Sequence, residues 1–437
     1  MSDEPQSATV GTDSSRQAKS SLLTLATISL LVGGAVGLLC GLFRLSLAHV
    51  EVWRTDFLAW MHNWNLAGMF CVVVACAATV ATAAWLVRRF APLASGSGIP
   101  HVEAVLTGEL PPASPQLLLV KFAGGLLAIG SGLALGREGP SVQMGASLAH
   151  LIGRLFRRDW QDCRLLLAAG AGAGLAVAFN APIAGAVFVL EELTRRFDTR
   201  TAIVTFGASA SAIAVGRILF GNAPDFLVVP LPYAGFGCLP VCLTLGILAG
   251  LLGVAYNRTL LGAMAAANGL RCWPVEMRAA AVGAAVGLLG WCAPGLLGGG
   301  DEMTQRALTG AEGGGLLFAV FLLRFAFGPA SYAAGTPGGL FAPMLVLGAQ
   351  SGLFFGNFAQ HWFPGMAGEP VAYAVTGMAA FFTAVVRAPL TGIILVIELT
   401  GSYTQLLPML AACFAAMLVP TLLNSPPIYD ALKKPVK

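Results

Sequence analysis

The chain has 437 residues, of which 57% are hydrophobic and only 11% are charged, and its formal net charge is +4. Because soluble domains carry about a quarter charged residues, this composition excludes a water-soluble globular protein and predicts a protein that crosses a membrane several times. The basic residues lie in short loops and not along one face, so nothing in the chain indicates nucleic-acid binding.

The polar N-terminus is followed by a series of apolar runs. Residues 1–20, rich in Ser, Asp and Gln, are predicted to be a disordered tail and not a cleaved signal, since no charged segment leads into a short apolar stretch with a cleavage site. Long apolar runs lie at residues 22–42, 67–86, 166–190, 240–255, 279–297, 313–323 and 406–423. Because about 20 apolar residues span a bilayer, we expect an all-α polytopic protein with about a dozen membrane segments, some of them re-entrant.

Two clusters of arginine lie between apolar runs. The first contains Arg154, Arg157, Arg158 and Arg164, and the second contains Arg195, Arg196 and Arg200. Such clusters favour the cytoplasmic side of a membrane. Re-entrant segments break the odd-even counting of spans, so from sequence only the second cluster is assigned to the cytoplasm.

Two pairs of segments match between the halves of the chain. Residues 181–185 (Ala-Pro-Ile-Ala-Gly) and Glu191 align with residues 388–392 (Ala-Pro-Leu-Thr-Gly) and Glu398, and the same offset pairs Gly170 with Gly377. A second match aligns Gly136, Pro140, Gly145, Ala146 and Gly153 with Gly339, Pro343, Gly348, Ala349 and Gly356. Glycine and alanine matches could arise from composition alone in a chain with 54 glycines, but the Pro and Glu matches favour a duplicated unit. We expect a first repeat at about residues 21–220 and a second at about residues 235–425, as in secondary transporters whose substrate site lies between repeats.

Gly-rich, Pro-interrupted segments break the apolar runs in both halves. Within a membrane, such breaks survive only where protein covers the exposed backbone or where they line a cavity. A helix that begins inside the membrane also directs its free backbone N–H groups and positive dipole end at that cavity. The breaks therefore predict an anion pathway.

Three breaks and one tyrosine carry this prediction. Residues 96–100 (Gly-Ser-Gly-Ile-Pro) offer a backbone that a ligand can approach closely and the hydroxyl of Ser97. Residues 136–140 (Gly-Arg-Glu-Gly-Pro) contain Glu138, whose charge at membrane depth would mark a transport or proton pathway; a surface glutamate paired with Arg137 is the alternative. Residues 338–343 (Gly-Gly-Leu-Phe-Ala-Pro) offer only backbone N–H groups. Tyr429 is either an interfacial anchor or a ligand.

In order and spacing, these segments resemble the CLC chloride channel and transporter family, whose signatures are Gly-Ser-Gly-Ile-Pro, Gly-Arg-Glu-Gly-Pro, Gly-x-Phe-x-Pro and a late tyrosine. The resemblance covers about residues 22–429. It implies a CLC-type fold of two inverted repeats with tilted and re-entrant helices over residues 21–430, followed by a short tail at residues 431–437. That tail is too short for the nucleotide-binding domains that many eukaryotic relatives append, so no cytoplasmic regulatory domain is expected.

The resemblance also implies roles for individual residues. Ser97 and Tyr429 are similar to the hydroxyl ligands of the central chloride, with the backbone N–H groups of Leu340 and Phe341 completing the shell. Glu138 resembles the external gating glutamate, whose carboxylate occupies an anion site and leaves it when protonated. In the family, proline at the position of Ser97 accompanies nitrate preference, so Ser97 favours chloride. The expected anion site also includes Gly96, Gly98, Ile99, Arg137, Gly139 and Gly339.

Glu192 bears on the choice between an exchanger and a channel. Glu191 aligns with Glu398 and could simply cap the duplicated unit, whereas Glu192 has no counterpart. The second glutamate of this Phe-x-x-Glu-Glu pattern resembles the internal proton acceptor of CLC exchangers, and a solvated helix end paired with Arg195 or Arg196 is the alternative. Since an exchanger needs anion and proton routes that meet at a shared group, chloride/proton exchange is the leading hypothesis and a passive channel on the same fold is the alternative.

Three further cations, Lys121, Arg137 and Arg324, lie near the motifs. They either raise the positive potential of the route or pair with Glu103 or Glu109.

Other classes are less well supported. An intramembrane serine hydrolase using Ser97 is a remote alternative, because no motif pairs any of the five histidines with that serine, and we expect no enzyme. The nine cysteines include no Cys-x-x-Cys pair, so neither a metal site nor a disulfide framework is expected, and chloride is the only bound ion foreseen. The expected partners are chloride, protons and the lipid bilayer. The resemblance implies a homodimer with one pathway per subunit, and the lack of extra domains or a targeting sequence favours a bacterial inner (plasma) membrane.

Overall fold

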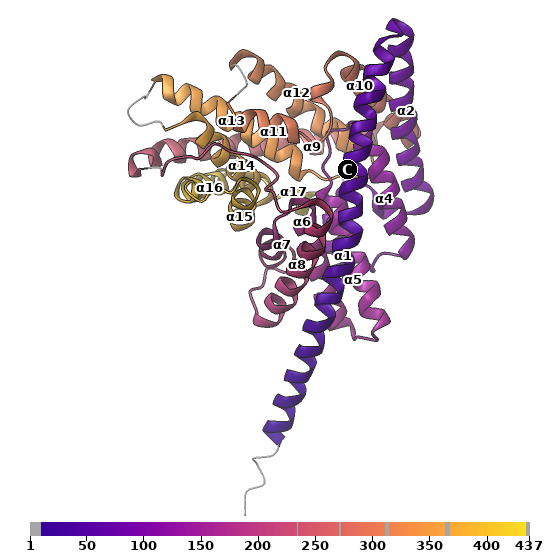
Figure 1. Ribbon diagram of the computed structural model, residues 1–437, viewed down its shortest axis with the longest axis vertical. Coiled ribbons are helices and arrows are strands. Elements are labelled where there is room, and N and C mark those ends of the chain that lie inside the picture. The colour runs from indigo at the N-terminus through magenta and orange to yellow at the C-terminus, as the bar shows by residue number, and fades with distance from the viewer. Residues whose placement is uncertain (1–9, 234, 271, 311–313, 363–367, 434–437) are drawn as a thin grey trace, which may run out of the picture.

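Helices joined by short loops make up the described part of the chain, residues 10–233, 235–270, 272–310, 314–362 and 368–433 of a computed structural model (Figure 1). The first half contains α1 (Val10–His62), α2 (Asn65–Phe90), α3 (Ile99–Thr107), α4 (Pro115–Gly130), α5 (Glu138–Leu155), α6 (Trp160–Phe179), α7 (Pro182–Phe188), the π-helical turn η2 (Val189–Leu193) and α8 (Thr199–Phe220). The second half contains α9 (Leu239–Gly269), α10 (Val275–Cys292), α11 (Asp301–Leu308), α12 (Gly314–Ala333), α13 (Phe341–Trp362), α14 (Pro370–Val386), α15 (Pro389–Thr400), α16 (Leu406–Leu422) and α17 (Ile428–Lys433).

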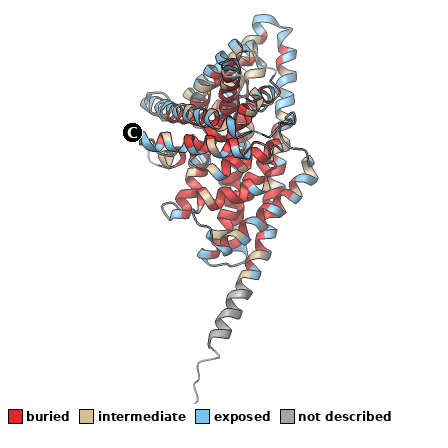
Figure 2. Ribbon diagram, turned by 90° about the vertical axis from the view of Figure 1, so that its left-hand side faces the viewer, coloured by how far each residue is buried: buried red, intermediate tan, exposed pale blue. Residues whose placement is uncertain are grey.

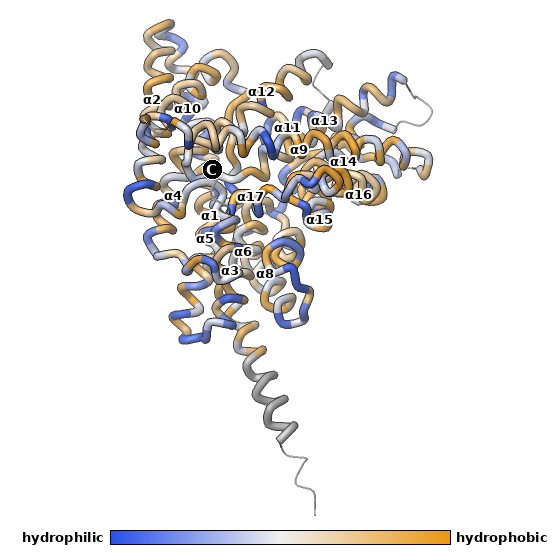
Figure 3. The backbone as a smooth tube through the Cα atoms, turned by 180° about the vertical axis from the view of Figure 1, so that it is seen from behind, coloured by the Kyte–Doolittle hydropathy of each residue, from blue (hydrophilic) through white to orange (hydrophobic). Residues whose placement is uncertain are grey.

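The helices are those of a multi-pass membrane protein. Among the described residues, seven helices are long and apolar enough to cross a membrane, namely α1, α2, α6, α8, α9, α10 and α13. Shorter apolar helices, α4, α12, α14, α15 and α16, complete the dozen expected segments. Buried residues (red) fill the middle of the molecule in Figure 2, whereas the outer helices in Figure 3 are rich in apolar residues (orange). Many large apolar side chains are exposed, as expected of a surface that a bilayer covers. The predicted all-α membrane fold is confirmed.

The N-terminus differs from the expectation of a disordered tail. Helix α1 begins at Val10, so residues 10–20 are helical, while residues 1–9 lie outside the described part. No proline interrupts residues 10–21, so the hydrogen-bonded ladder of the apolar helix can extend into the polar segment.

Equivalent glycines make equivalent contacts in the two halves. A Cβ on Gly145 would lie 2.2 Å from the carbonyl oxygen of Gly170, so α5 and α6 pack with their backbones in close approach. A Cβ on Gly348 would lie 2.6 Å from the carbonyl oxygen of Gly377, which brings α13 and α14 together in the same way. The sequence alignment matches Gly145 with Gly348 and Gly170 with Gly377, so the two halves contain the same helix contact. The prediction of two related halves is confirmed.

The apolar run at residues 166–190 is not one span. It is divided between α6 and α7 at Asn180, whose φ of 51° is left-handed, and the following Pro182 begins the next helix. The second half repeats this break between α14 and α15, with Arg387 at a φ of 74° and Pro389 in the next helix. The duplicated Ala-Pro sequence thus encodes a duplicated helix interruption inside the core.

Candidate functional site

The three Gly-rich breaks meet at one point in the core. The backbone N–H of Gly96 donates to the Thr336 carbonyl at 3.0 Å, and the N–H of Gly338 donates to the Gly96 carbonyl at 3.1 Å. Gly136 and Gly339 exchange two backbone hydrogen bonds, of 2.9 and 2.7 Å. Backbone hydrogen bonds therefore connect segments that are more than 200 residues apart in the sequence.

Three helices begin beside these backbone pairs. Helix α3 starts at Ile99, after Gly98 in the left-handed region at a φ of 85°; α5 starts at Glu138 and α13 at Phe341. The first turns of a helix have N–H groups without intrahelical partners, so the start of α13 offers the N–H groups of Leu340 and Phe341. A Cβ on Gly139 would lie 2.5 Å from the Ser97 Oγ, which explains why glycine stands where α5 approaches the first break. Together the three starts give the site a positive dipole field.

Two hydroxyl groups lie in this buried region. Ser97 and Tyr429 are fully buried, and neither hydroxyl has a hydrogen-bond partner among the described residues. The ring of Tyr429 stacks on that of Phe341, with centroids 6.1 Å apart and an interplanar angle of 24°. A buried polar group left without a partner costs about 1–3 kcal/mol, so these donors fit a small anion between them.

Glu138 is buried at the first residue of α5 and is only 2% exposed. Its Oε2 has no hydrogen-bond partner in the described chain, and it would lie 3.3 Å from a Cβ placed on Gly339. The carboxylate thus lies at the point where the second and third breaks meet. It borders a cavity of about 180 Å³ that is also lined by Arg44, Glu51 and Asp301. The alternative of a surface glutamate is therefore wrong.

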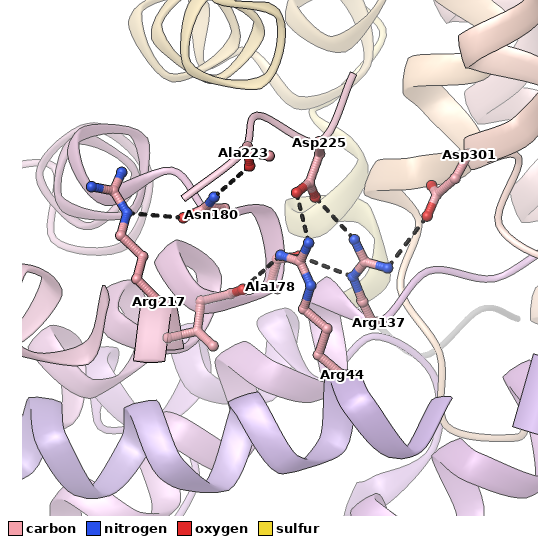
Figure 4. Close-up of polar contacts among 9 residues, drawn as sticks. Arg44, Arg137, Ala178, Asn180, Arg217, Ala223, Asp225 and Asp301 are labelled. Carbon is pink, nitrogen blue, oxygen red and sulfur yellow. Dashed lines mark hydrogen bonds and ion pairs between the residues drawn. The ribbon is translucent and has the colours of Figure 1, made fainter. Parts of the chain in front are cut away.

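Arg137 has three partners other than its neighbour Glu138, and Figure 4 shows these contacts. Its Nε donates to the Ala178 carbonyl at 2.9 Å, Nη2 pairs with Asp225 at 3.1 Å and Nη1 pairs with Asp301 at 3.3 Å. Asp225 also pairs with Arg44 at 2.6 Å. Arg137 therefore lies at the mouth of the site, in the wall of a second cavity of about 300 Å³, with its donors committed to protein groups.

Asp225 and Arg44 were not predicted as members of the site. Asp225 lies in the segment that joins the two halves, between α8 and α9, and Arg44 lies within α1. No motif surrounds either residue, and their partners are distant in sequence, so no signal in the sequence identified them.

Glu192 lies in η2 and is buried, with 4% of its surface exposed. Its Oε1 has no hydrogen bond within the described residues, and the nearest cation is Arg195, with Nη2 at 3.9 Å. Arg195 itself pairs with Asp430 at 3.2 Å. The alternative of a solvated helix end is therefore wrong, because Glu192 is a buried carboxylate with one distant cation.

Residues of the short C-terminal helix α17 form ion pairs with α3 and with the segment after η2. Lys433 pairs with Glu103 at 2.5 Å and with Asp430 at 3.1 Å. Burial opposes ionisation of Asp430, yet hydrogen bonds from Lys433 and the charge of Arg195 hold the pKa of this carboxyl below its usual range. These pairs place Tyr429, one residue before Asp430, firmly in the core.

Lys121 and Tyr332 fix the first break. The fully buried Lys121 donates to the carbonyls of Ala94 and Gly96 at 3.0 and 2.7 Å. The Tyr332 hydroxyl, which the sequence did not single out, accepts from the Ser97 N–H at 3.2 Å. The Ser97 hydroxyl, and not its backbone N–H, is thus the group left free.

The alternative that Lys121, Arg137 or Arg324 pairs with Glu103 or Glu109 is wrong. Glu103 pairs with Lys433, and Arg324 donates to the carbonyls of Gly298 and Gly299 at 2.8 Å each. Arg324 therefore supports the loop before α11. Lys121 and Arg324 donate to backbone carbonyls because buried cations need acceptors, whereas Arg137 also has the carboxylates of Asp225 and Asp301.

The arrangement gives no support to a serine hydrolase. His101, the histidine closest to Ser97 in sequence, places its Nδ1 3.2 Å from the Gln143 side-chain nitrogen. The Ser97 Oγ has no hydrogen bond to a base in the described structure. A nucleophile without a base within hydrogen-bonding reach lacks the geometry of that chemistry.

Comparisons with known proteins find relatives over most of the chain. The family model for the voltage gated chloride channel matches residues 78–421. The chain is 38% identical over 420 residues to the H(+)/Cl(−) exchange transporter ClcA of Vibrio cholerae, covering 93% of this chain and 88% of the relative. It is 37% identical over 421 residues to the ClcA of Cronobacter sakazakii, covering 94% and 89%. The crystal structure of a slow cyanobacterial Cl−/H+ antiporter superposes with a TM-score of 0.89 at 31% identity, covering 94% of this chain and 97% of that one.

Proposed function

Because the chain belongs to the voltage-gated chloride channel family, we propose that it exchanges chloride for protons across the membrane. The observation that carries this proposal is the buried Glu138 carboxylate, which lies among helix N-termini and unpartnered hydroxyl groups. That environment suits an anion, and the carboxylate is an anion only while it is ionised. The relatives named as H(+)/Cl(−) exchange transporters support exchange over passive conduction.

Chloride binds between the three helix starts and the two hydroxyls. Ser97 and Tyr429 donate their hydroxyl protons, and Leu340 and Phe341 donate their backbone N–H groups. The backbone of Gly96, Gly98, Ile99, Gly139 and Gly339 forms the surrounding wall, and Arg137 contributes positive charge at the mouth. Four donors replace part of the hydration shell of the ion, as in other anion sites built on helix N-termini.

Glu138 couples the two ions. Its carboxylate competes with chloride for the donors while it is charged, and protonation removes that attraction and lets the side chain leave. Glu192, on the side of α17, passes protons to or from Glu138 through intervening water. Because the same carboxylate blocks the anion route and carries the proton, one ion moves inward as the other moves outward.

Reconstitution tests this proposal directly. Purified protein is placed in liposomes with a chloride gradient and no proton gradient, and external pH is recorded. Exchange predicts that protons move uphill, driven by chloride, and that the movement reverses with the gradient. Chloride flux without proton movement would identify a passive channel instead.

The same relatives support proposals about the membrane and the assembly. The chain is an integral multi-pass membrane protein, and we infer a bacterial inner membrane because the relatives named above come from bacteria. We infer a homodimer with one pathway per subunit from the family resemblance. Cross-linking in native membranes followed by mass measurement tests the dimer, and a monomer at all protein concentrations contradicts it.

A further inference from the structure

A basic cavity of about 470 Å³ lies where α6 and α8 begin and η2 ends. Its lining includes Trp160, Arg164, Arg196, Asp198, Arg200 and Thr201. The two arginine clusters of the sequence therefore meet at one place, although only the second was assigned to the cytoplasm. Buried Asp162 joins them, because it forms ion pairs with both Arg158 and Arg200.

The position of the cavity corresponds to the head-group level of a bilayer. Trp160 and Thr199 are the first residues of two candidate membrane spans, so the cavity lies at the ends of these spans. Trp160 is 46% exposed and Phe197 is 67% exposed, and exposed aromatic residues at the end of a span are typical of the membrane interface. Basic clusters mark the cytoplasmic side, where the leaflet carries anionic lipids.

The cavity has an excess of positive charge. Arg200 is occupied by Asp162, and the Asp198 carboxylate accepts from the Thr201 N–H at 2.9 Å and from its hydroxyl at 2.6 Å. Those two hydrogen bonds lower the pKa of Asp198, so this carboxylate is charged but already committed to the start of α8. Arg164 and Arg196 are exposed, and neither guanidinium group forms an ion pair or a hydrogen bond with another residue of the described chain.

We propose that this cavity binds the phosphate group of an anionic phospholipid of the cytoplasmic leaflet, with Arg164 and Arg196 as its charged ligands. Arginine suits this role because its planar guanidinium forms paired hydrogen bonds with phosphate oxygens. Trp160 lies beside the glycerol region, where its ring has both polar and apolar neighbours. The inference rests on the cavity and the membrane fold, and not on the direction or coupling of ion transport.

A bound lipid would also act on the transport machinery. Leu193 and Thr194, which follow Glu192, form part of the cavity wall. A phosphate held by Arg196 restrains this segment, so anionic lipid stabilises the turn that carries Glu192.

Single substitutions with a matched control test the site. Arg164→Gln and Arg196→Gln each remove a proposed ligand, while Arg154→Gln removes one charge from the same exposed cluster without touching the cavity lining. Detergent-purified variants are mixed with phosphatidylglycerol or phosphatidylcholine, and bound lipid is counted by native mass spectrometry. We expect the preference for phosphatidylglycerol to fall about tenfold in each ligand variant, as for the loss of a charge-assisted hydrogen bond, and to change by less than about threefold in Arg154→Gln.

Two results would overturn the proposal that the cavity binds an anionic phospholipid. Equal losses in Arg154→Gln and in the ligand variants would show that general surface charge attracts the lipid. Protection against heat by inorganic phosphate, without any preference for phosphatidylglycerol, would show that the source is a soluble anion. Unchanged melting temperatures of all three variants in phosphatidylcholine exclude misfolding as the cause of a loss.

Discussion

Glu191 and Glu398 cap each other's helices across the two halves of the molecule. The Glu191 carboxylate accepts from the N–H groups that begin α15, including that of Thr391 at 2.7 Å, and the Glu398 carboxylate accepts from those that begin α7, including that of Ala184 at 2.7 Å. Each glutamate lies near the C-terminal end of its own segment, so α7 and α15 run antiparallel. The sequence alignment paired these two residues, and the structure shows that they are partners in one reciprocal contact.

We predict that breaking this contact destabilises the core. Glu398→Ala removes the acceptor for two N–H groups, one exposed and one part-buried, which costs about 1–3 kcal/mol. Glu191→Ala should lower the free energy of unfolding by a similar amount. The double variant should lower it by less than the sum of the two single effects, because both glutamates hold the same pair of helices. Thermal unfolding in detergent measures the effect, with exposed Glu302→Gln as the control. Melting temperatures equal to that of the control would contradict a structural role.

The sequence predicted the parts of the site that depend on local patterns. The Gly-Ser-Gly-Ile-Pro and Gly-Arg-Glu-Gly-Pro segments identify helix starts because glycine and proline have fixed backbone preferences. The sequence did not predict three contacts: the ion pair of Asp225 with Arg137, the ion pair of Lys433 with Glu103, and the hydrogen bond that the Tyr332 hydroxyl accepts from the Ser97 N–H. These pairs join residues 88, 330 and 235 positions apart, and only the packing of the helices decides which residues meet.

Glu138→Gln should separate chloride movement from proton movement. Glutamine resembles a protonated glutamate in shape but cannot release a proton, so the variant should retain chloride flux and lose both proton transport and the pH dependence of flux. Liposome chloride efflux recorded from pH 4.5 to 7.5, together with a pH electrode, measures both ions. Proton transport at the wild-type rate would remove Glu138 from the mechanism.

Glu192→Gln should leave chloride transport within about twofold and reduce proton transport at least tenfold, since it removes the inner relay but none of the chloride ligands. The buried side chain keeps its size, so the turn η2 should remain intact. The same liposome assay applies, and Glu302→Gln again serves as the control because, among the described residues, its carboxylate forms an ion pair with Arg306 of α11 alone. Unchanged coupling would assign proton entry to another residue.

Asp225→Asn should alter the mouth of the site without touching a proposed ligand. It removes the shared partner of Arg44 and Arg137, which frees Arg137 to pair with the adjacent Glu138. We expect slower chloride exchange and a stronger dependence on pH, because an ion pair would hold the carboxylate in place until it is protonated.

The double variant Arg44→Gln/Asp225→Asn distinguishes position from charge. It restores the local net charge but still leaves Arg137 without Asp225, so the slow phenotype should persist if position matters. Recovery of the wild-type rate in the double variant would show that net charge alone is responsible.

Tyr429→Phe should weaken chloride binding by about three- to tenfold, because one neutral hydrogen bond contributes about 0.5–1.5 kcal/mol. The ring remains stacked on Phe341, so the fold should be retained. Ser97→Ala should have a similar effect on affinity, since the Ser97 hydroxyl is also buried and unpartnered within the described chain. Tyr332→Phe is the matched control: it removes a buried hydroxyl that holds the Ser97 backbone and does not face the ion in our proposal. Calorimetric titration with chloride gives the affinities. If Tyr332→Phe weakens chloride binding as much as Tyr429→Phe does while their melting temperatures agree, then Tyr429 acts through the protein and not as a ligand.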